Sequence, residues 1–175
     1  AAVTTAKIAD ANITTGKLAS SLDLSGKTVT YGLTDSDMPA GSVLQVVHGQ
    51  TNTTVVIATT TYTDTGLTLT ITPKSTSSKI LISWNLQVEL SVSGSGVGVR
   101  LLRDTTALRT SATQYDMYCA GFTGQRVKGG WSYLDSPATT SAITYKIQVG
   151  TYNNTSNRIN ADSNTSDITL MEIAG

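Results

Sequence analysis

The residues that could do chemistry in this 175-residue chain are few and far apart. His48 is the single histidine, so any Ser–His–Asp or Cys–His mechanism would have to use it. It precedes Gly49 at the end of a predicted strand, where an exposed or hydrogen-bonded side chain is typical. Cys119, the single cysteine, shares a strand phase with Tyr115 and Met117 and lacks the basic neighbours that activate a thiolate. Both residues therefore indicate structural roles.

The carboxylates give no better case for an enzyme. No spacing requires two of them to face each other, as glycoside hydrolysis would need. One cysteine excludes an intrachain disulfide, and the sequence has no cluster of Cys and His for zinc. We therefore expect no enzymatic activity, no cofactor and no metal site. The carboxylates considered are Glu89, Asp104, Asp116, Asp135 and Glu172.

Aromatic and amide side chains give the sequence its candidate binding surface. An aromatic pair follows the turn at 128–130, and the segment 152–166 is rich in Asn and Ser. Neutral sugars are held by stacking on aromatic faces and by hydrogen bonds from amides and hydroxyls. The alternatives are that the pair packs inside the fold or against a neighbour, and that 152–166 is a solvated connection. The candidate glycan or partner surface comprises Trp131, Tyr133, Tyr152, Asn153, Asn154, Asn157 and Arg158.

The elements that must hold these residues are β-strands. The longest alternation runs over 79–90, where every second residue is apolar. Trp84 is one of these apolar residues, and we assign it to the core. Its other face should meet solvent or neighbouring subunits. No helical stretch separates the alternating segments, so we predict an all-β, antiparallel, jelly-roll-like sandwich. The further strands are predicted at 43–48, 53–58, 67–71, 97–101, 106–110, 115–120, 126–134, 143–149 and 168–173.

The last of these segments differs from the others. Apolar residues occupy both of its phases, Ile168 and Leu170 on one and Met171 and Ile173 on the other. A strand with apolar side chains on both faces needs another part of the protein, or a partner, to cover each face. This pattern predicts that one face of the strand meets a neighbouring subunit.

The first thirty residues form an internal repeat with a period of ten. V-T-T-A-K-I-A-D at 3–10 returns as I-T-T-G-K-L-A-S at 13–20. The apolar members recur every five residues, which fits neither a strand nor a helix, but parallel copies of the chain could point them at a shared axis. A flexible polar linker is the alternative. We predict a stalk or docking segment at 1–30, a linker at 31–41 and a sandwich at 42–175, with the axis residues Val3, Ile8, Ile13 and Leu18.

Charge and hydropathy exclude two classes of partner. Twelve basic and twelve acidic residues cancel, so no net field steers the chain to nucleic acid or to acidic lipid. No apolar run approaches the length of a membrane span, and the first residues lack the pattern of a signal peptide. We expect neither nucleic-acid binding nor membrane insertion.

Three stretches together resemble one broad class of proteins. They are the tandem units at 3–20, the sequence M-P-A-G-S-V-L-Q-V-V at 38–47, and T-S-S-K-I-L-I at 76–82 with the ending I-T-L-M-E-I-A-G. They resemble the C-terminal parts of tailed-bacteriophage fibre and other virion structural proteins. The resemblance implies a homotrimer with an axial stalk and a β-rich knob similar to the jelly roll of the tumour-necrosis-factor and C1q class. Many such fibre tips hold iron with pairs of histidines, which the lone His48 cannot form.

The resemblance implies a component of the extracellular virion, joined to other virion proteins through its N-terminal segment. In the first hypothesis it is the tip of a tail fibre that attaches to a bacterial surface polysaccharide. The alternative is a capsid or tail decoration protein, or a head-fibre protein, with no receptor binding of its own.

Overall fold

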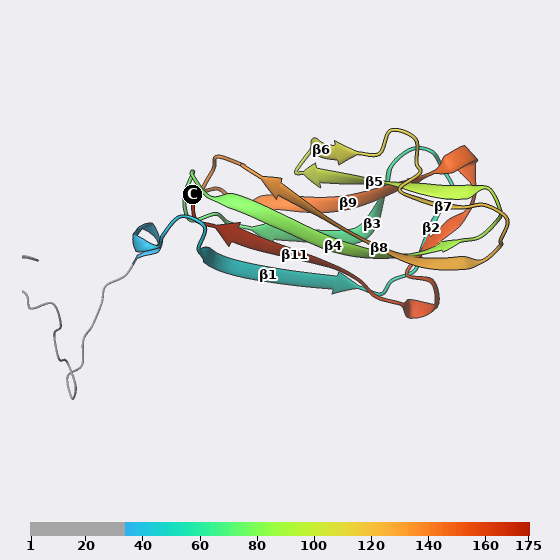
Figure 1. The fold of residues 1–175 in the computed structure, drawn as a ribbon, viewed down its shortest axis with the longest axis horizontal. Helices are drawn as coiled ribbons and strands as arrows, with labels where there is room; N and C mark the ends of the chain where they lie inside the picture. Colours follow the sequence, from blue (N-terminus) through green and yellow to red (C-terminus); the bar gives the residue numbers. More distant parts are fainter. Residues whose placement is uncertain (1–33) are drawn as a thin grey trace, which may run out of the picture. The chain divides into compact units, whose positions relative to one another are not determined.

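The structure, a computed structural model, describes residues 34–175 (Figure 1). The predicted stalk with its axis residues Val3, Ile8, Ile13 and Leu18 lies outside the described residues. Residues 34–175 contain no α-helix, and no helix among them could cross a membrane. The strands are β1 Val43–Thr51, β2 Val55–Ile57, β3 Thr63–Ile71, β4 Lys79–Leu90, β5 Ser95–Arg103, β6 Thr106–Thr110, β7 Met117–Cys119, β8 Gln125–Asp135, β9 Ile143–Thr151, β10 Asn157–Ile159 and β11 Ser166–Ile173. Short 3₁₀ turns are η3 Asp35–Asp37, η4 Tyr152–Asn154 and η5 Ala161–Ser163.

The strands form two antiparallel sheets that pack face to face. The first, which we call the β4 sheet, has the order β1-β11-β4-β10-β2, with β8 on the other edge of β4. The second, the β9 sheet, has the order β3-β9-β5-β6, with β7 also paired to β5. The prediction of an all-β antiparallel sandwich is confirmed.

The strand order is that of a jelly roll. β1 and β2 act as one interrupted strand, because they pair with β11 and β10, which in turn lie along one edge of β4. β6 and β7 likewise share an edge of β5. The eight resulting strands pair first with last (β1 with β11), second with seventh (β3 with β9), third with sixth (β4 with β8) and fourth with fifth (β5 with β6 and β7). Successive pairs alternate between the two sheets, as in a long hairpin that has been rolled up.

The core follows from the alternation along β4. The strand spans 79–90 as predicted, and its inward phase is fully buried against inward residues of β5 and β9. Trp84 lies at the centre of this face with no exposed surface, which confirms its assignment to the core. The fully buried inward residues of β4 are Ile80, Ile82, Trp84, Leu86, Val88 and Leu90.

Most of the predicted strands differ from the structure by one to four residues at one or both ends. β1 continues past His48 to Thr51, because its ladder with β11 extends to the pair Thr51 and Ser166. β5 begins at Ser95, two residues before its predicted start at 97. The reason is Gly96, where an added Cβ would lie 2.8 Å from the carbonyl oxygen of Gln114, so only glycine lets the two segments approach this closely.

The segment 152–166, in which no strand was predicted, is not one irregular connection. It contains β10, whose three residues pair with β4 on one side and with β2 on the other. Asn157 and Ile159 of this strand are fully buried. The prediction failed because a three-residue strand that buries an asparagine has no hydrophobic periodicity.

The sandwich has two distinct ends. At the end that we call the base, residues 34–42 join β1. Near the start of β4 at this end, Ile80 is paired to both Glu172 and Asp135. At the opposite end β4 finishes with Leu90 paired to Gln125 and Asn157. The twelve residues of β4 separate the two ends by about 36 Å, at roughly 3.3 Å per residue. Figure 1 shows η3 at the base and β7 near the opposite end.

Candidate functional site

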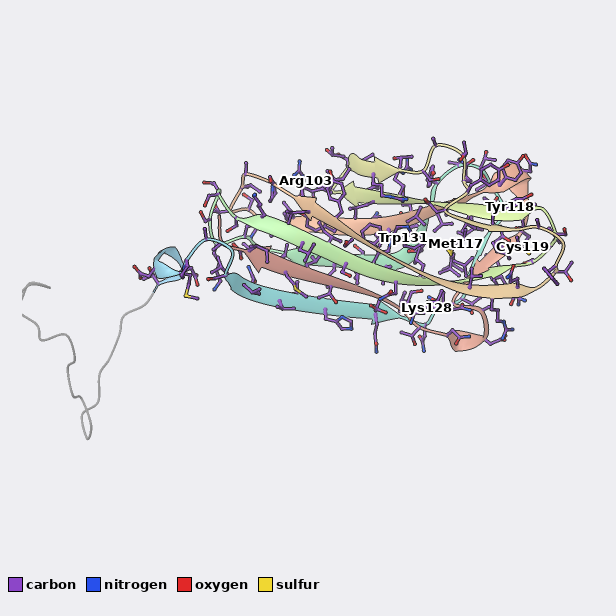
Figure 2. The ribbon with its side chains drawn as sticks, viewed as in Figure 1. Arg103, Met117, Tyr118, Cys119, Lys128 and Trp131 are labelled. Atoms are coloured by element: carbon purple, nitrogen blue, oxygen red, sulfur yellow. The ribbon has the colours of Figure 1, made fainter. Side chains whose placement is uncertain are left out.

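Three tyrosines form a cluster at the end of the sandwich opposite the base. Tyr118 lies in β7, Tyr152 in η4, and Tyr115 in the connection that precedes β7. The ring centroids of Tyr115 and Tyr152 are 4.5 Å apart, those of Tyr115 and Tyr118 are 5.0 Å apart, and those of Tyr118 and Tyr152 are 6.2 Å apart. We call these three residues the tyrosine cluster, and Figure 2 marks its position by Tyr118.

The tyrosine cluster is open to solvent. Tyr115 and Tyr118 each leave nearly half of their surface exposed, and Tyr152 is partly exposed. Phe122, in the turn that follows β7, is 70% exposed at the same end. Large aromatic side chains gathered in the open are unusual for a surface without a partner, so this end is the candidate binding surface.

Glycines make room for the cluster. A Cβ at Gly96 would meet the Tyr118 ring at 3.1 Å, and Gly94 has a φ of +74° with the Tyr118 hydroxyl near its Cβ position. A residue with a side chain at 96 would push the ring away, and one at 94 would strain the turn. The S-G-S-G sequence after β4 therefore lets Tyr118 lie across the start of β5.

A buried polar network fixes the turns around the cluster. Asn157 Oδ1 accepts a hydrogen bond from the backbone N–H of Ser91 at 3.1 Å and another from the hydroxyl of Ser95. Asn157 Nδ2 donates to the carbonyl of Gly96 at 3.3 Å. Thr155, hydrogen-bonded to Ser95, donates its hydroxyl to the carbonyl of Tyr152 at 2.8 Å. The network thus links the turn after β4 to the turn that carries Tyr152.

Tyr115 of the cluster is uncharged at neutral pH. A hydrogen bond with the side chain of Tyr152, together with partial desolvation and the neighbouring tyrosines, raises the pKa of Tyr115 to about 12. Its hydroxyl therefore stays protonated and can both donate and accept a hydrogen bond. The exposed Asn153, which has a φ of +52°, adds an amide next to Tyr152. Aromatic faces, hydroxyls and an amide together can stack on and hydrogen-bond a neutral ligand.

Trp131 and Tyr133, predicted as part of the binding surface, lie elsewhere. Both are on the inward face of β8 and pack partly buried against the core. Trp131 stacks on Trp84 with ring centroids 6.1 Å apart, and the guanidinium of Arg109 lies 5.9 Å from its ring centroid. In the ladder Tyr133 pairs with Ile82, nearer to the base. The structure therefore brings neither residue into the tyrosine cluster, and both fit the packing alternative.

The candidates from 152–166 separate in space. Tyr152 and Asn153 lie at the cluster, and Asn154 is the last residue of η4. Asn157 is buried and belongs to the supporting network, so its amide is not offered to a ligand. Arg158 pairs with Glu89 on the outward face of the β4 sheet.

The remaining candidate chemistry is structural. His48 is exposed on β1, with its Nδ1 3.0 Å from the hydroxyl oxygen of Thr169. Cys119 is buried in the core, as expected, and its thiol donates to the carbonyl of Phe122. Three of the five carboxylates considered form ion pairs with arginines: Asp116 with Arg109, Asp135 with Arg103, and Glu89 with both Arg126 and Arg158. Within 34–175, no three residues among His, Cys, Asp and Glu are grouped to hold a metal ion.

Comparison with known proteins identifies no family for this chain. No protein-family model and no curated protein matches the chain. Solved structures from infectious bursal disease virus are similar: its T13 viral particle (TM-score 0.46, 13% identity, 85% of this chain and 41% of that chain) and its Gx strain (TM-score 0.45, 13% identity, 90% and 45%). Its VP2 subviral particle has a TM-score of 0.40 at 15% identity, over 90% of this chain and 46% of that chain. The chain spans less than half the length of those chains, and no function is carried over from them.

Proposed function

We propose that this chain is a non-enzymatic structural protein of a bacteriophage virion, and that its tyrosine cluster binds a polysaccharide on the host surface. The observation that carries the proposal is the exposed tyrosine cluster at the end of the sandwich opposite the base. A protein that is held by one end and binds with the other needs this arrangement. The bacteriophage part of the proposal rests on the sequence resemblance, which also implies a homotrimer.

The chemistry of the cluster favours a neutral sugar as ligand. Tyrosine offers a large, rigid aromatic face at a low cost in conformational entropy. Its hydroxyl can hydrogen-bond the hydroxyls of a sugar whose apolar face stacks on the ring. Tyr115 carries no charge at neutral pH, and the chain has no net charge, so no net field draws an anionic ligand to the protein.

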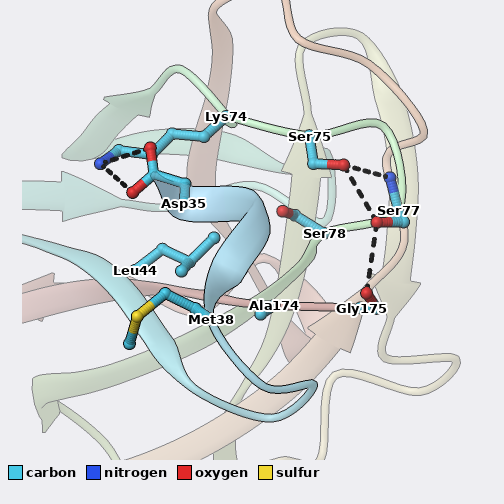
Figure 3. A pocket seen from close by; sticks show the side chains of 9 residues that line it. All are labelled: Asp35, Met38, Leu44, Lys74, Ser75, Ser77, Ser78, Ala174 and Gly175. Carbon is cyan, nitrogen blue, oxygen red and sulfur yellow. Dashed lines mark hydrogen bonds and ion pairs between the residues drawn. The ribbon is translucent and has the colours of Figure 1, made fainter. Parts of the chain in front are cut away.

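The base is suited to hold the chain in place. The backbone N–H of Gly41 donates to the carbonyl of Ala174 at 2.8 Å, and the N–H of Ala174 donates to the carbonyl of Ser42 at 2.8 Å. Asp35 forms an ion pair with Lys74 at 3.1 Å, beside a small pocket that is also lined by Met38 (Figure 3). We propose that residues 1–30 join the sandwich to other virion proteins from this end.

Replacing the aromatic rings should weaken attachment. A double variant with Tyr118→Ala and Tyr152→Ala should lower binding to extracted host surface polysaccharide by about ten-fold or more, because each ring contributes roughly 0.5–1.5 kcal/mol beyond its buried area. Tyr118→Phe, which keeps the ring, should lose less. Binding would be measured on immobilised polysaccharide, and particle adsorption to host cells would be measured with the same variants.

Thermal unfolding of each variant is the control for folding. If the double variant is folded and binds host polysaccharide and cells like the wild type, the attachment proposal is wrong. That result would favour the alternative, a decoration or head-fibre protein without receptor binding of its own.

A further inference from the structure

An apolar band crosses the outward face of the β4 sheet near the base. The strand register places Val46 of β1 opposite Met171 of β11, Met171 opposite Leu81 of β4, and Leu81 opposite Leu134 of β8. Side chains of residues paired in this way point to the same face of a sheet. The next row toward the base adds Val43 and Ile173. We call these six residues the apolar band: Val43, Val46, Leu81, Leu134, Met171 and Ile173.

The band is exposed and confined to one part of the face. Leu134 is 53% exposed, and Val43 and Val46 are about equally so. The next row away from the base is polar throughout, formed by His48, Thr169, Ser83 and Ser132. The apolar surface thus spans four strands but only two rows of paired residues along them. A contiguous exposed apolar surface of this kind marks a contact site.

A shallow groove extends the band toward the base. It is lined mainly by apolar atoms, and Leu81, Leu134 and Ile173 form it together with Ala40 and Gly41 of the segment that enters the sandwich. Lys79 is the one charged side chain among the described residues that line the groove. Two identical surfaces could therefore meet here with little repulsion between like charges.

We infer that the apolar band docks a second copy of this chain. Thr34, which the other 33 residues of the chain precede, belongs to the segment at the base, and the band lies near the same end. Copies joined in parallel through the N-terminal repeats would have their bases side by side, at a high effective concentration for a further contact. The band lies near the base, so it would be close to the corresponding surface of such a copy. This inference does not depend on the tyrosine cluster.

The pattern of apolar residues in β11 also supports docking of a second copy on the apolar band. Ile168 and Leu170 of β11 are buried in the core, whereas Met171 and Ile173 face outward with no other part of residues 34–175 covering them fully. In a monomer the outward phase of such a strand would be polar. A second copy would bury these residues, as would a fold-back of residues 1–33 or another virion protein, and the experiment separates the three.

Sedimentation of the full-length chain tests the inference. The wild type should form multimers, and the double variant Leu134→Lys with Met171→Lys should need at least a ten-fold higher concentration to assemble. Val56→Lys is the matched control, because Val56 is 61% exposed on the outward side of the same sheet but lies outside the band. A monomeric wild type, or assembly unchanged by the double variant, would overturn the inference.

Thiol labelling identifies what covers the band. In the assembled fraction, a cysteine introduced by Leu134→Cys should react with maleimide at least ten-fold more slowly than one introduced by Val56→Cys; the buried Cys119 gives the background rate. Slow labelling in a monomer would show that residues 1–33 cover the band and would overturn the inference. Equal rates in a multimer would overturn it too, because the copies would then be joined elsewhere, and the band would be open to another virion protein.

Discussion

An Asn157→Ala variant should lose about 2–5 kcal/mol of unfolding free energy, because each buried polar group left without a partner costs roughly 1–3 kcal/mol. The substitution removes the acceptor for the backbone N–H of Ser91 and the donor to the carbonyl of Gly96, and it takes one partner from the Ser95 hydroxyl. Since this network supports the turn that carries Tyr152, polysaccharide binding should fall as the turn loosens.

Asn153→Ala is the matched control for this variant. Asn153 is exposed, so its loss should change stability by no more than about 0.5 kcal/mol. Urea unfolding followed by circular dichroism would measure both variants. If Asn157→Ala proved as stable as the wild type and yet lost binding, Asn157 would be a ligand contact and would not have the supporting role.

A Trp84→Ala variant should lose about 3–5 kcal/mol, the usual cost of removing a large aromatic side chain from a packed core. Trp84 is fully buried at the centre of β4 and stacks on Trp131, so the cavity would open between the two sheets and the β8 edge. The strand ladders hold the rest of the core in place, so the surrounding side chains could not fill this cavity. Thermal or urea unfolding would measure the loss.

Trp84→Phe should be much less costly. The indole N–H of Trp84 is buried and has no hydrogen-bond partner among the described residues. Phenylalanine keeps an aromatic ring in the core and removes this unsatisfied donor. Removing the donor offsets part of the free-energy cost of the lost volume. Equal losses for the alanine and phenylalanine variants would mean that the indole N–H has a partner, such as a buried water, in the folded protein.

The core could be predicted from the sequence because it depends on local alternation. Every second residue of 79–90 is apolar, and that pattern alone determines which face of β4 is buried. The apolar residues on both phases of 168–173 likewise predicted two covered faces; the structure shows one of them in the core, and contact of the other with a neighbour stays a prediction.

The tyrosine cluster could not be predicted in the same way. Tyr115 and Tyr118 are more than thirty residues from Tyr152 in the sequence, and the rolled pairing of the jelly roll brings them together. Trp131 was placed in the predicted binding surface because the glycines before it suggested an exposed turn. In the structure Gly129 and Gly130 lie within β8. An added Cβ at Gly129 would lie 2.5 Å from the Trp131 ring, so the glycine makes space for packing.

We propose opposite roles for the two ends of the sandwich. The base, with its apolar band, would join copies of the chain to one another and to the particle. The tyrosine end, supported by the buried Asn157 network, would face outward to a polysaccharide. Both roles depend on the orientation of the sandwich on the virion.

Electron cryo-microscopy of intact particles tests that orientation most directly. A small tag inserted in the turn 120–124, at the tyrosine end, would be compared with one in the turn 136–142, at the base. We expect density for the first tag at the outermost point of the protein and density for the second closer to the particle. The reverse order, or a tyrosine end covered by other virion proteins, would contradict the proposed function.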